Sequence, residues 1–199
     1  TNGGTIDQAG HDSAFSGVFS DQAADQPGSV EIVNSGTGGS VTFAAANTYT
    51  GGTTIGSGAT LALSGNGSIA SSSGVTADGT LDIAGSSGPT HISTLDGHGM
   101  VTLGNNYLVL DQASGQFGGS IGGQGGLVVN AGVESLSGTN NYGGGTYLNG
   151  GSLHVGSDAS LGAAGGGLDF NGGDLTVTQS MTTGRSISAN AGGASLTTP

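Results

Sequence analysis

Short alternating segments, separated by glycine-rich turns, constrain this fold more than any other feature of the sequence. Apolar and polar residues alternate in residues 60–63, 80–83, 100–103, 152–155 and 174–177. A period of two over about four residues, bounded by Gly, Asn or Ser, predicts a β-strand with one buried face. The sequence therefore predicts many short strands, each with its aliphatic residues on the inner side.

Glycine accounts for 45 of the 199 residues, and its distribution argues against helices. Asn-Gly-Gly occurs at residues 149–151 and 171–173, and both Asn and Gly tolerate the positive φ angles of sharp turns. No window carries the apolar spacing of an amphipathic helix, and this glycine density would destabilise one. We therefore expect an all-β chain with essentially no helix.

A sequence repeat links the two halves of the chain. When Tyr49 is aligned with Tyr142, the Gly-Gly-Thr residues that follow coincide. After a gap of one residue, Leu61 is aligned with Leu153. Two segments further upstream, residues 6–9 and 15–19, have counterparts at residues 110–113 and 117–121, at slightly different offsets. The internal repeats thus span about residues 6–100 and 110–199, with insertions placed in loops.

Two all-β architectures use short strands of this kind. A β-sandwich joins antiparallel strands by hairpins and needs no long-range self-similarity. A parallel β-helix stacks turn upon turn, about 4.8 Å apart, and repetition is what such stacking predicts. We favour the β-helix: at roughly 20–25 residues per turn, a single segment covering the whole chain gives roughly eight or nine rungs.

The charge balance excludes several classes of partner. The chain has 13 Asp and Glu residues, no Lys and one Arg, Arg185, and its formal net charge is -12. Binding to nucleic acid and to anionic lipid both depend on Lys and Arg, so we expect neither. There is no cysteine, and no apolar run approaches the length of a membrane span, so we expect no direct membrane insertion of this segment.

The segment NTYTGGTTI at residues 47–55, followed by Gly58 and by LAL at residues 61–63, resembles the passenger-associated repeat of bacterial autotransporters, also called the autotransporter-associated β-strand repeat. The second copy departs from the family pattern at Asn141, Gly143 and Tyr147, where the family has Thr. Residues 117–127 and 180–185 resemble two further segments of this family, FxGxIxGxGGL and SFTTxR. Together these motifs cover most of the chain.

The resemblance implies a right-handed parallel β-helix that forms part of a longer passenger. Such a passenger is exported across the outer membrane to the bacterial cell surface through a translocator barrel, expected elsewhere in the full protein. The resemblance implies a structural stalk that supports adhesion or the display of a virulence factor, with a host or bacterial surface protein or a glycan as its partner. Two alternatives stay open: the non-catalytic stalk of an autotransporter serine protease or esterase whose catalytic domain lies outside this chain, and a self-association module for aggregation or biofilm formation.

Serine and histidine residues that could carry chemistry do not form a recognisable site. Ser120 stands in a G-x-S-x-G match, but a nucleophile elbow needs a strand-to-helix turn, and no helix is expected there. His11, His91, His98 and His154 lack metal-ligand spacing, and we expect all four to be exposed.

The carboxylates are interpreted as exposed, solubilising charge. Gly-Gly-Asp at residues 172–174 is a fragment of a calcium-binding repeat, but it is not iterated. Asp82 and Asp174 flank alternating aliphatic residues and should point outward. We therefore expect no enzyme, no cofactor, and no catalytic, cofactor-binding or metal-binding residues.

The corner residues that recur in both copies of the repeat are interpreted as structural. Tyr49 and Tyr142 occupy equivalent corners, and we expect each ring to cover the edge of a rung rather than to bind a partner. Asn47, Asn140 and Asn105 are expected to stack inside corners as amide ladders, as in cross-β structures.

Overall fold

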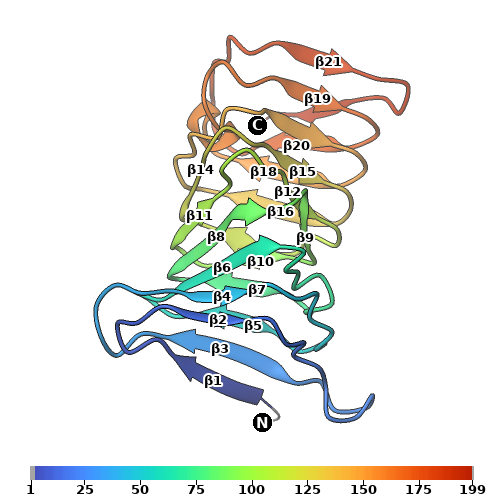
Figure 1. Cartoon of the computed structure of the whole chain (residues 1–199). Helices are drawn as coiled ribbons and strands as arrows, with labels where there is room; N and C mark the ends of the chain where they lie inside the picture. Colours follow the sequence, from blue (N-terminus) through green and yellow to red (C-terminus); the bar gives the residue numbers. More distant parts are fainter. Residues whose placement is uncertain (1–2, 199) are drawn as a thin grey trace.

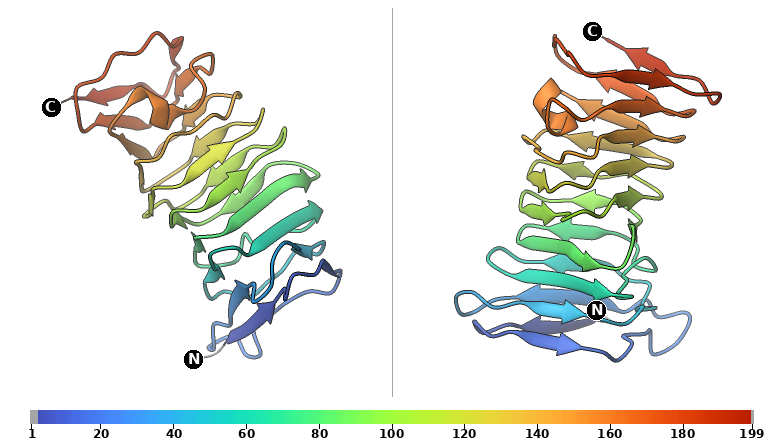
Figure 2. Two further views of the ribbon diagram at one scale, coloured as in Figure 1. Left: turned by 90° about the vertical axis from the view of Figure 1, so that its left-hand side faces the viewer. Right: turned by 45° about the horizontal axis from the view of Figure 1, so that its top comes forward.

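The computed structural model describes residues 3–198 and is an all-β parallel solenoid of about eight turns, whose stacked strands are seen in Figure 1. The turns stack along one axis, and the two ends of the chain lie at opposite ends of the stack (Figure 2). Every strand pair between the named strands is parallel. The predicted architecture is therefore confirmed, and the sandwich alternative, which needs antiparallel hairpins, is excluded.

The strands form three faces, which we number in the order that the chain visits them within a turn. Face 1 contains β1 (Gly3–Asp7), β3 (Ser29–Val33), β5 (Thr53–Ile55), β7 (Val75–Ala77) and β10 (Leu95–Asp96), and continues through β13 (Gln116–Phe117), β16 (Val133–Leu136), β18 (Ser152–Val155), β20 (Asp174–Val177) and β22 (Ser195–Thr197). An isolated parallel bridge between Gly97 and Phe117 joins its two halves. Face 2 contains β2 (Ser13–Phe15), β4 (Val41–Phe43), β6 (Thr60–Gly65), β8 (Thr80–Ser86), β11 (Met100–Thr102) and β14 (Ser120–Gly122). Face 3 contains β9 (Thr90–Ile92), β12 (Leu108–Leu110), β15 (Leu127–Val129), β17 (Thr146–Leu148), β19 (Leu168–Phe170) and β21 (Ile187–Ala189).

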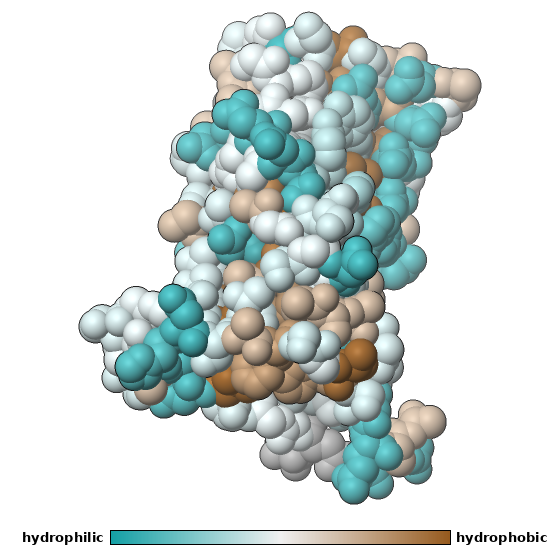
Figure 3. Space-filling view, viewed as in Figure 1, coloured by the Kyte–Doolittle hydropathy of each residue, from teal (hydrophilic) through white to brown (hydrophobic). Residues whose placement is uncertain are grey.

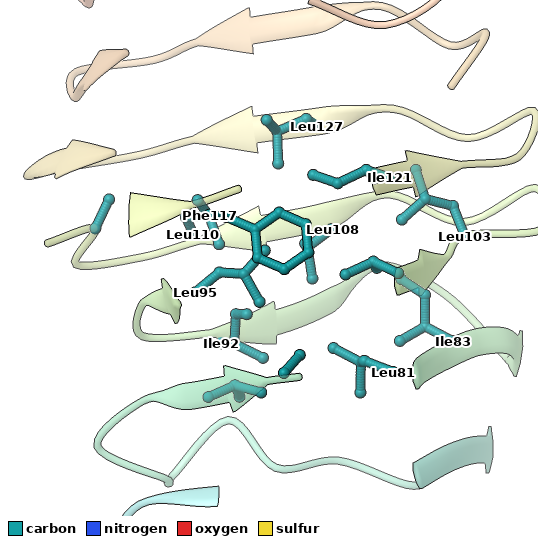
Figure 4. Close-up of a cluster of buried hydrophobic side chains, with 14 of the residues drawn as sticks. Leu81, Ile83, Ile92, Leu95, Leu103, Leu108, Leu110, Phe117, Ile121 and Leu127 are labelled. Carbon is teal, nitrogen blue, oxygen red and sulfur yellow. The ribbon is translucent and has the colours of Figure 1, made fainter. Parts of the chain in front are cut away.

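Aliphatic side chains fill the interior in columns because alternate residues of a strand point to the same side. One column on face 2 runs through Val41, Leu61, Leu81, Val101 and Ile121, which pair in register and are all fully buried. Leu153 is buried in the same way on face 1, so the prediction that Leu61 and Leu153 point inward is confirmed. Figure 4 shows how side chains from the three faces meet in the central turns. Burial of one such side chain contributes about 1.5–3 kcal/mol.

The two copies of the sequence repeat do not stack on each other. The first copy contributes β5 to face 1 and β6 to face 2, whereas the matching strands of the second copy, β17 and β18, lie on faces 3 and 1. The distance between the copies is therefore not a whole number of turns. The same corner sequence is used at a different edge of the solenoid, which our interpretation of the repeat as rung-on-rung stacking does not anticipate.

Helical structure is limited to one turn. Residues 3–198 contain a single 3-10 turn, η1 (Asp158–Leu161), in agreement with the expectation of essentially no helix. Among the described residues, no helix has the length and apolar character needed to cross a membrane.

Candidate functional site

The residues singled out for chemistry lie apart from one another. Ser120 is exposed within β14 and does not stand at the strand-to-helix turn that a nucleophile elbow requires. His11, His91 and His98 are exposed as predicted, whereas His154 is half-buried on the outer side of β18. Within residues 3–198, no three His, Asp or Glu side chains are placed to hold a metal ion.

One carboxylate contradicts the interpretation of all acidic residues as surface charge. Asp82 and Asp174 point outward as predicted, but Glu134 in β16 is fully buried. Its Oε2 accepts a hydrogen bond from the Gly115 amide at 3.3 Å, and its Oε1 has no partner among the described residues. Burial raises the pKa of Glu134 to about 8. The signal in the sequence is its position two residues before Leu136, because alternate residues of a strand point to the same side and Leu136 points inward.

The two repeated tyrosines are structural, as expected. Tyr49 and Tyr142 are buried, and each hydroxyl lies within hydrogen-bond distance of a Thr hydroxyl four residues later, at 2.6 Å from Thr53 and 2.7 Å from Thr146. Burial raises the pKa of each tyrosine to about 12. A role for either ring as a surface contact is therefore excluded, and the shared geometry explains why the corner sequence recurs.

The predicted amide ladder of corner asparagines is wrong. Asn47 and Asn140 are buried, but each one connects three successive turns on its own. The Oδ1 of Asn140 accepts from the Ile121 amide at 2.8 Å, and its Nδ2 donates to the Ser160 carbonyl at 2.7 Å. Asn105 is exposed, because its neighbour Asn106 makes the inward hydrogen bonds.

An amide ladder does exist, on face 3, at positions that the sequence analysis did not single out. Asn149 Nδ2 donates to Asn130 Oδ1 at 3.0 Å, and Asn130 Nδ2 donates to Asp111 Oδ1 at 2.8 Å. His91 Nδ1 lies 2.9 Å from the second oxygen of Asp111. The signal in the sequence is an Asp or Asn directly after each face-3 strand from β12 onward, which continues at Asn171 and Asn190.

Apolar side chains form a second column beside this ladder. Val109, Val128 and Tyr147 pair in register, each two residues before a member of the ladder. The Tyr147 ring meets the Tyr107 ring edge-on, with centroids 5.8 Å apart. Gly126 lies close to this pair, because a Cβ atom at this position would stand 2.8 Å from the Tyr107 ring. Burial is the largest cause that raises the pKa of Tyr147, and its interaction with Tyr107 and the charge of Asp169 raise this pKa further.

These two columns form the most distinctive surface feature, which we call the face-3 strip. It consists of an apolar column and an amide column, namely Tyr107, Val109, Val128 and Tyr147 beside Asp111, Asn130, Asn149, Asn171 and Asn190. Asn149, Asn171 and Asn190 are exposed, and Tyr107, Val128 and Tyr147 are half-buried. The strip therefore offers apolar surface and hydrogen-bonding amides side by side over several turns.

The single cation of the chain is taken up by the fold. Arg185 is buried, and its guanidinium donates to both carboxylate oxygens of Asp158, at 2.8 and 3.2 Å. It also donates to the carbonyls of Ala163 and Gly162, at 2.6 and 2.7 Å. These hydrogen bonds hold η1 and the loop after it against the next turn, and they leave the described surface without a free Arg or Lys.

A second apolar region lies near the N-terminal turns. Hydrophobic residues gather in the lower part of the view in Figure 3, while most of the remaining surface is hydrophilic or intermediate. Within these turns Val18 is exposed, and Phe15 and Phe19 are half-buried against Phe43, with the Phe19 and Phe43 centroids 4.8 Å apart. The three rings pack on one another, so this region extends the core more than it forms a separate site.

The terminal strands leave unpaired edges. Among the described residues, β1 pairs only with β3, and β22 pairs only with β20. Beside β22 an apolar cavity of about 470 Å³ opens between Phe170, Leu175 and Leu196. Edges of this kind can pair with another strand.

Comparison with known protein families, with curated proteins and with solved structures found no significant match to this chain.

Proposed function

We propose that this chain is a structural stalk of a bacterial surface protein of the autotransporter passenger type. The observation that supports this proposal most directly is the continuous parallel stack, in which each strand pairs only with strands of the adjacent turns. Such a stack grows in length without changing its cross-section, which suits a spacer between a cell surface and an adhesive or virulence-associated region. The motifs at residues 47–63 and 117–127 supply the link to the passenger family.

In this proposal the chain is extracellular, lies outside the membrane and has no catalytic role of its own. The alternative of a stalk beneath a serine protease or esterase domain assigns the same task to these residues. A self-association module is favoured by the open edges of β1 and β22. Sedimentation of the purified chain over a wide concentration range tests it, and a monomer throughout would argue against it.

Surface display tests the proposed function. The chain is fused to an outer-membrane translocator barrel, and the amount on intact cells is measured with an antibody by flow cytometry. The double variant Leu61→Asp with Leu63→Asp places two charges in the face-2 core and should reduce display strongly. Ala62→Asp, on the outer side of the same strand, is the matched control and should display normally. Normal display of the double variant would contradict the proposal.

A further inference from the structure

The face-3 strip combines two kinds of surface that one ligand class needs together. Val128 and Tyr147 present apolar surface, and Asn130 and Asn149 follow two residues later on the same outer side. A sugar ring likewise has an apolar face of C–H groups and a periphery of hydroxyls that donate and accept hydrogen bonds. Aromatic side chains with neighbouring polar groups fit such amphipathic ligands.

Unused hydrogen-bonding capacity is available along the amide column. Asn149 donates through Nδ2, but its Oδ1 has no partner among the described residues. The carboxamides of Asn171 and Asn190 make no hydrogen bond within residues 3–198. Each carboxamide offers two donors and an acceptor, which matches the dual character of hydroxyl groups. The ladder from Asp111 to Asn149 holds the carboxamides of Asn130 and Asn149 in fixed positions.

The spacing of the strip favours an extended chain of sugars. Successive members stand on successive turns, about 4.8 Å apart, which is close to the length of one sugar residue in an extended polysaccharide. The amide column covers five consecutive turns from Asp111 to Asn190. A polysaccharide lying parallel to the solenoid axis would therefore meet equivalent groups repeatedly.

Charge selects among polysaccharides. The formal net charge is -12, the sole cationic side chain, Arg185, is buried against Asp158, and Asp111 and Asp169 lie on face 3 itself. Sulfated or carboxylated glycans would be repelled, because nothing on the described surface replaces their counterions. A neutral glycan carries no such cost.

We infer that the face-3 strip binds a neutral, extended polysaccharide along the axis of the solenoid. Tyr147 and Val128 contact the apolar faces of the sugar rings, and the carboxamides of Asn149 and Asn171 bond to the hydroxyls. This inference rests on the proposed function, because a stalk at the cell surface meets host or bacterial glycans.

Calorimetric titration of the purified chain tests the inference. The probes are cellohexaose, N-acetylchitohexaose and mannohexaose as neutral glycans, and heparin as the anionic one. At least one neutral hexasaccharide should bind at millimolar concentration, and heparin should not. Tyr147→Ala should weaken that binding about tenfold, because the ring supplies most of the apolar contact. Asn149→Ala, at an exposed position, should weaken it severalfold and serves if Tyr147→Ala fails to fold.

The matched control is Asn66→Ala, because Asn66 is an exposed asparagine in the loop after β6; its affinity should equal that of the unchanged chain. Absence of binding to all three neutral probes, tighter binding of heparin, or binding that Asn149→Ala leaves unchanged would overturn the inference. The titration needs no display on cells, so the two proposals fail separately. A chain that binds glycan but is not displayed would refute the stalk, and a displayed chain without binding would refute only the glycan site.

Discussion

Replacing Glu134 with leucine should make the protein more stable, and the gain should grow with pH. Glu134 pairs in register with Leu153, which in turn pairs with Leu175, so the carboxyl occupies a position in an aliphatic column. Its Oε1 has no partner among the described residues, and the hydrogen bond that Oε2 accepts from the Gly115 amide is long, at 3.3 Å. Leucine at this position would add apolar burial and remove an unsatisfied polar group.

The magnitude follows from the shift in the pKa of Glu134, which burial raises from 4.5 to about 8. In the folded state the carboxyl stays protonated up to about pH 8, whereas in the unfolded chain it ionises above pH 4.5. Its contribution to stability is therefore complete below pH 4.5 and is lost progressively as the pH rises through 8. Each pH unit in this window lowers the free energy of unfolding by about 1.4 kcal/mol, so the loss at pH 7 is about 3 kcal/mol.

Urea unfolding followed by circular dichroism at pH 5, 6, 7 and 8 measures this effect. Glu134→Leu should unfold at a higher urea concentration than the unchanged chain, and the difference should increase with pH. Glu134→Gln should remove the pH dependence of stability that Glu134 causes, but without the stability gained by burying a leucine side chain. Glu31→Gln, at an exposed position on β3, is the matched control and should change stability by less than about 0.5 kcal/mol. A wild-type stability that is flat between pH 5 and 8, or a leucine variant less stable at pH 8, would refute the reasoning.

Three further changes test other parts of the fold, each by thermal unfolding. Arg185→Met should cost about 3–5 kcal/mol, because it leaves Asp158 and several carbonyls without their donor; an unchanged melting temperature would contradict the role given to this clamp. Tyr142→Phe and Tyr49→Phe should each cost about 1 kcal/mol through loss of one buried hydrogen bond, and unequal losses would argue against equivalent corners. Gly126→Ala should destabilise the chain and alter tyrosine fluorescence, since its Cβ would stand 2.6 Å from a backbone oxygen as well as against the Tyr107 ring; a neutral outcome would show that the rings can move freely.

The alternation of apolar and polar residues was sufficient to predict the strands and the interior. Four of the five alternating segments lie within strands, and the fifth, residues 100–103, extends one residue beyond the end of β11. Leu61 and Leu153 are buried as expected. Alternation reports which residues share a side of a strand, and that information is local. It does not locate Glu134, because a charged residue is ordinarily exposed, whereas the position two residues before buried Leu136 faces the interior.

The face-3 strip could not be predicted, because it depends on the lengths of turns. Gly3 pairs with Ser29, whereas Leu108 pairs with Leu127, so the turns of this solenoid differ in length. Without the register, nothing in the sequence places Tyr107 beside Tyr147, which lie two turns apart. For the same reason the sequence predicts an asparagine ladder at the corners, whereas the structure has it at residues that directly follow face-3 strands. The right-handed winding that the family resemblance implies stays a prediction.

The displaced repeat has a consequence for how such rods are built. When the spacing between two copies is not a whole number of turns, the second copy lies on different faces of the solenoid. It keeps the same hydrogen bond between Tyr and Thr at its corner. Loop residues alone do not have this effect, because turns of different length, such as Gly3 to Ser29 and Leu108 to Leu127, keep their strands in register. The number of faces that separate two copies, independently of motif sequence, thus decides the side on which a rod of this kind presents its contacts.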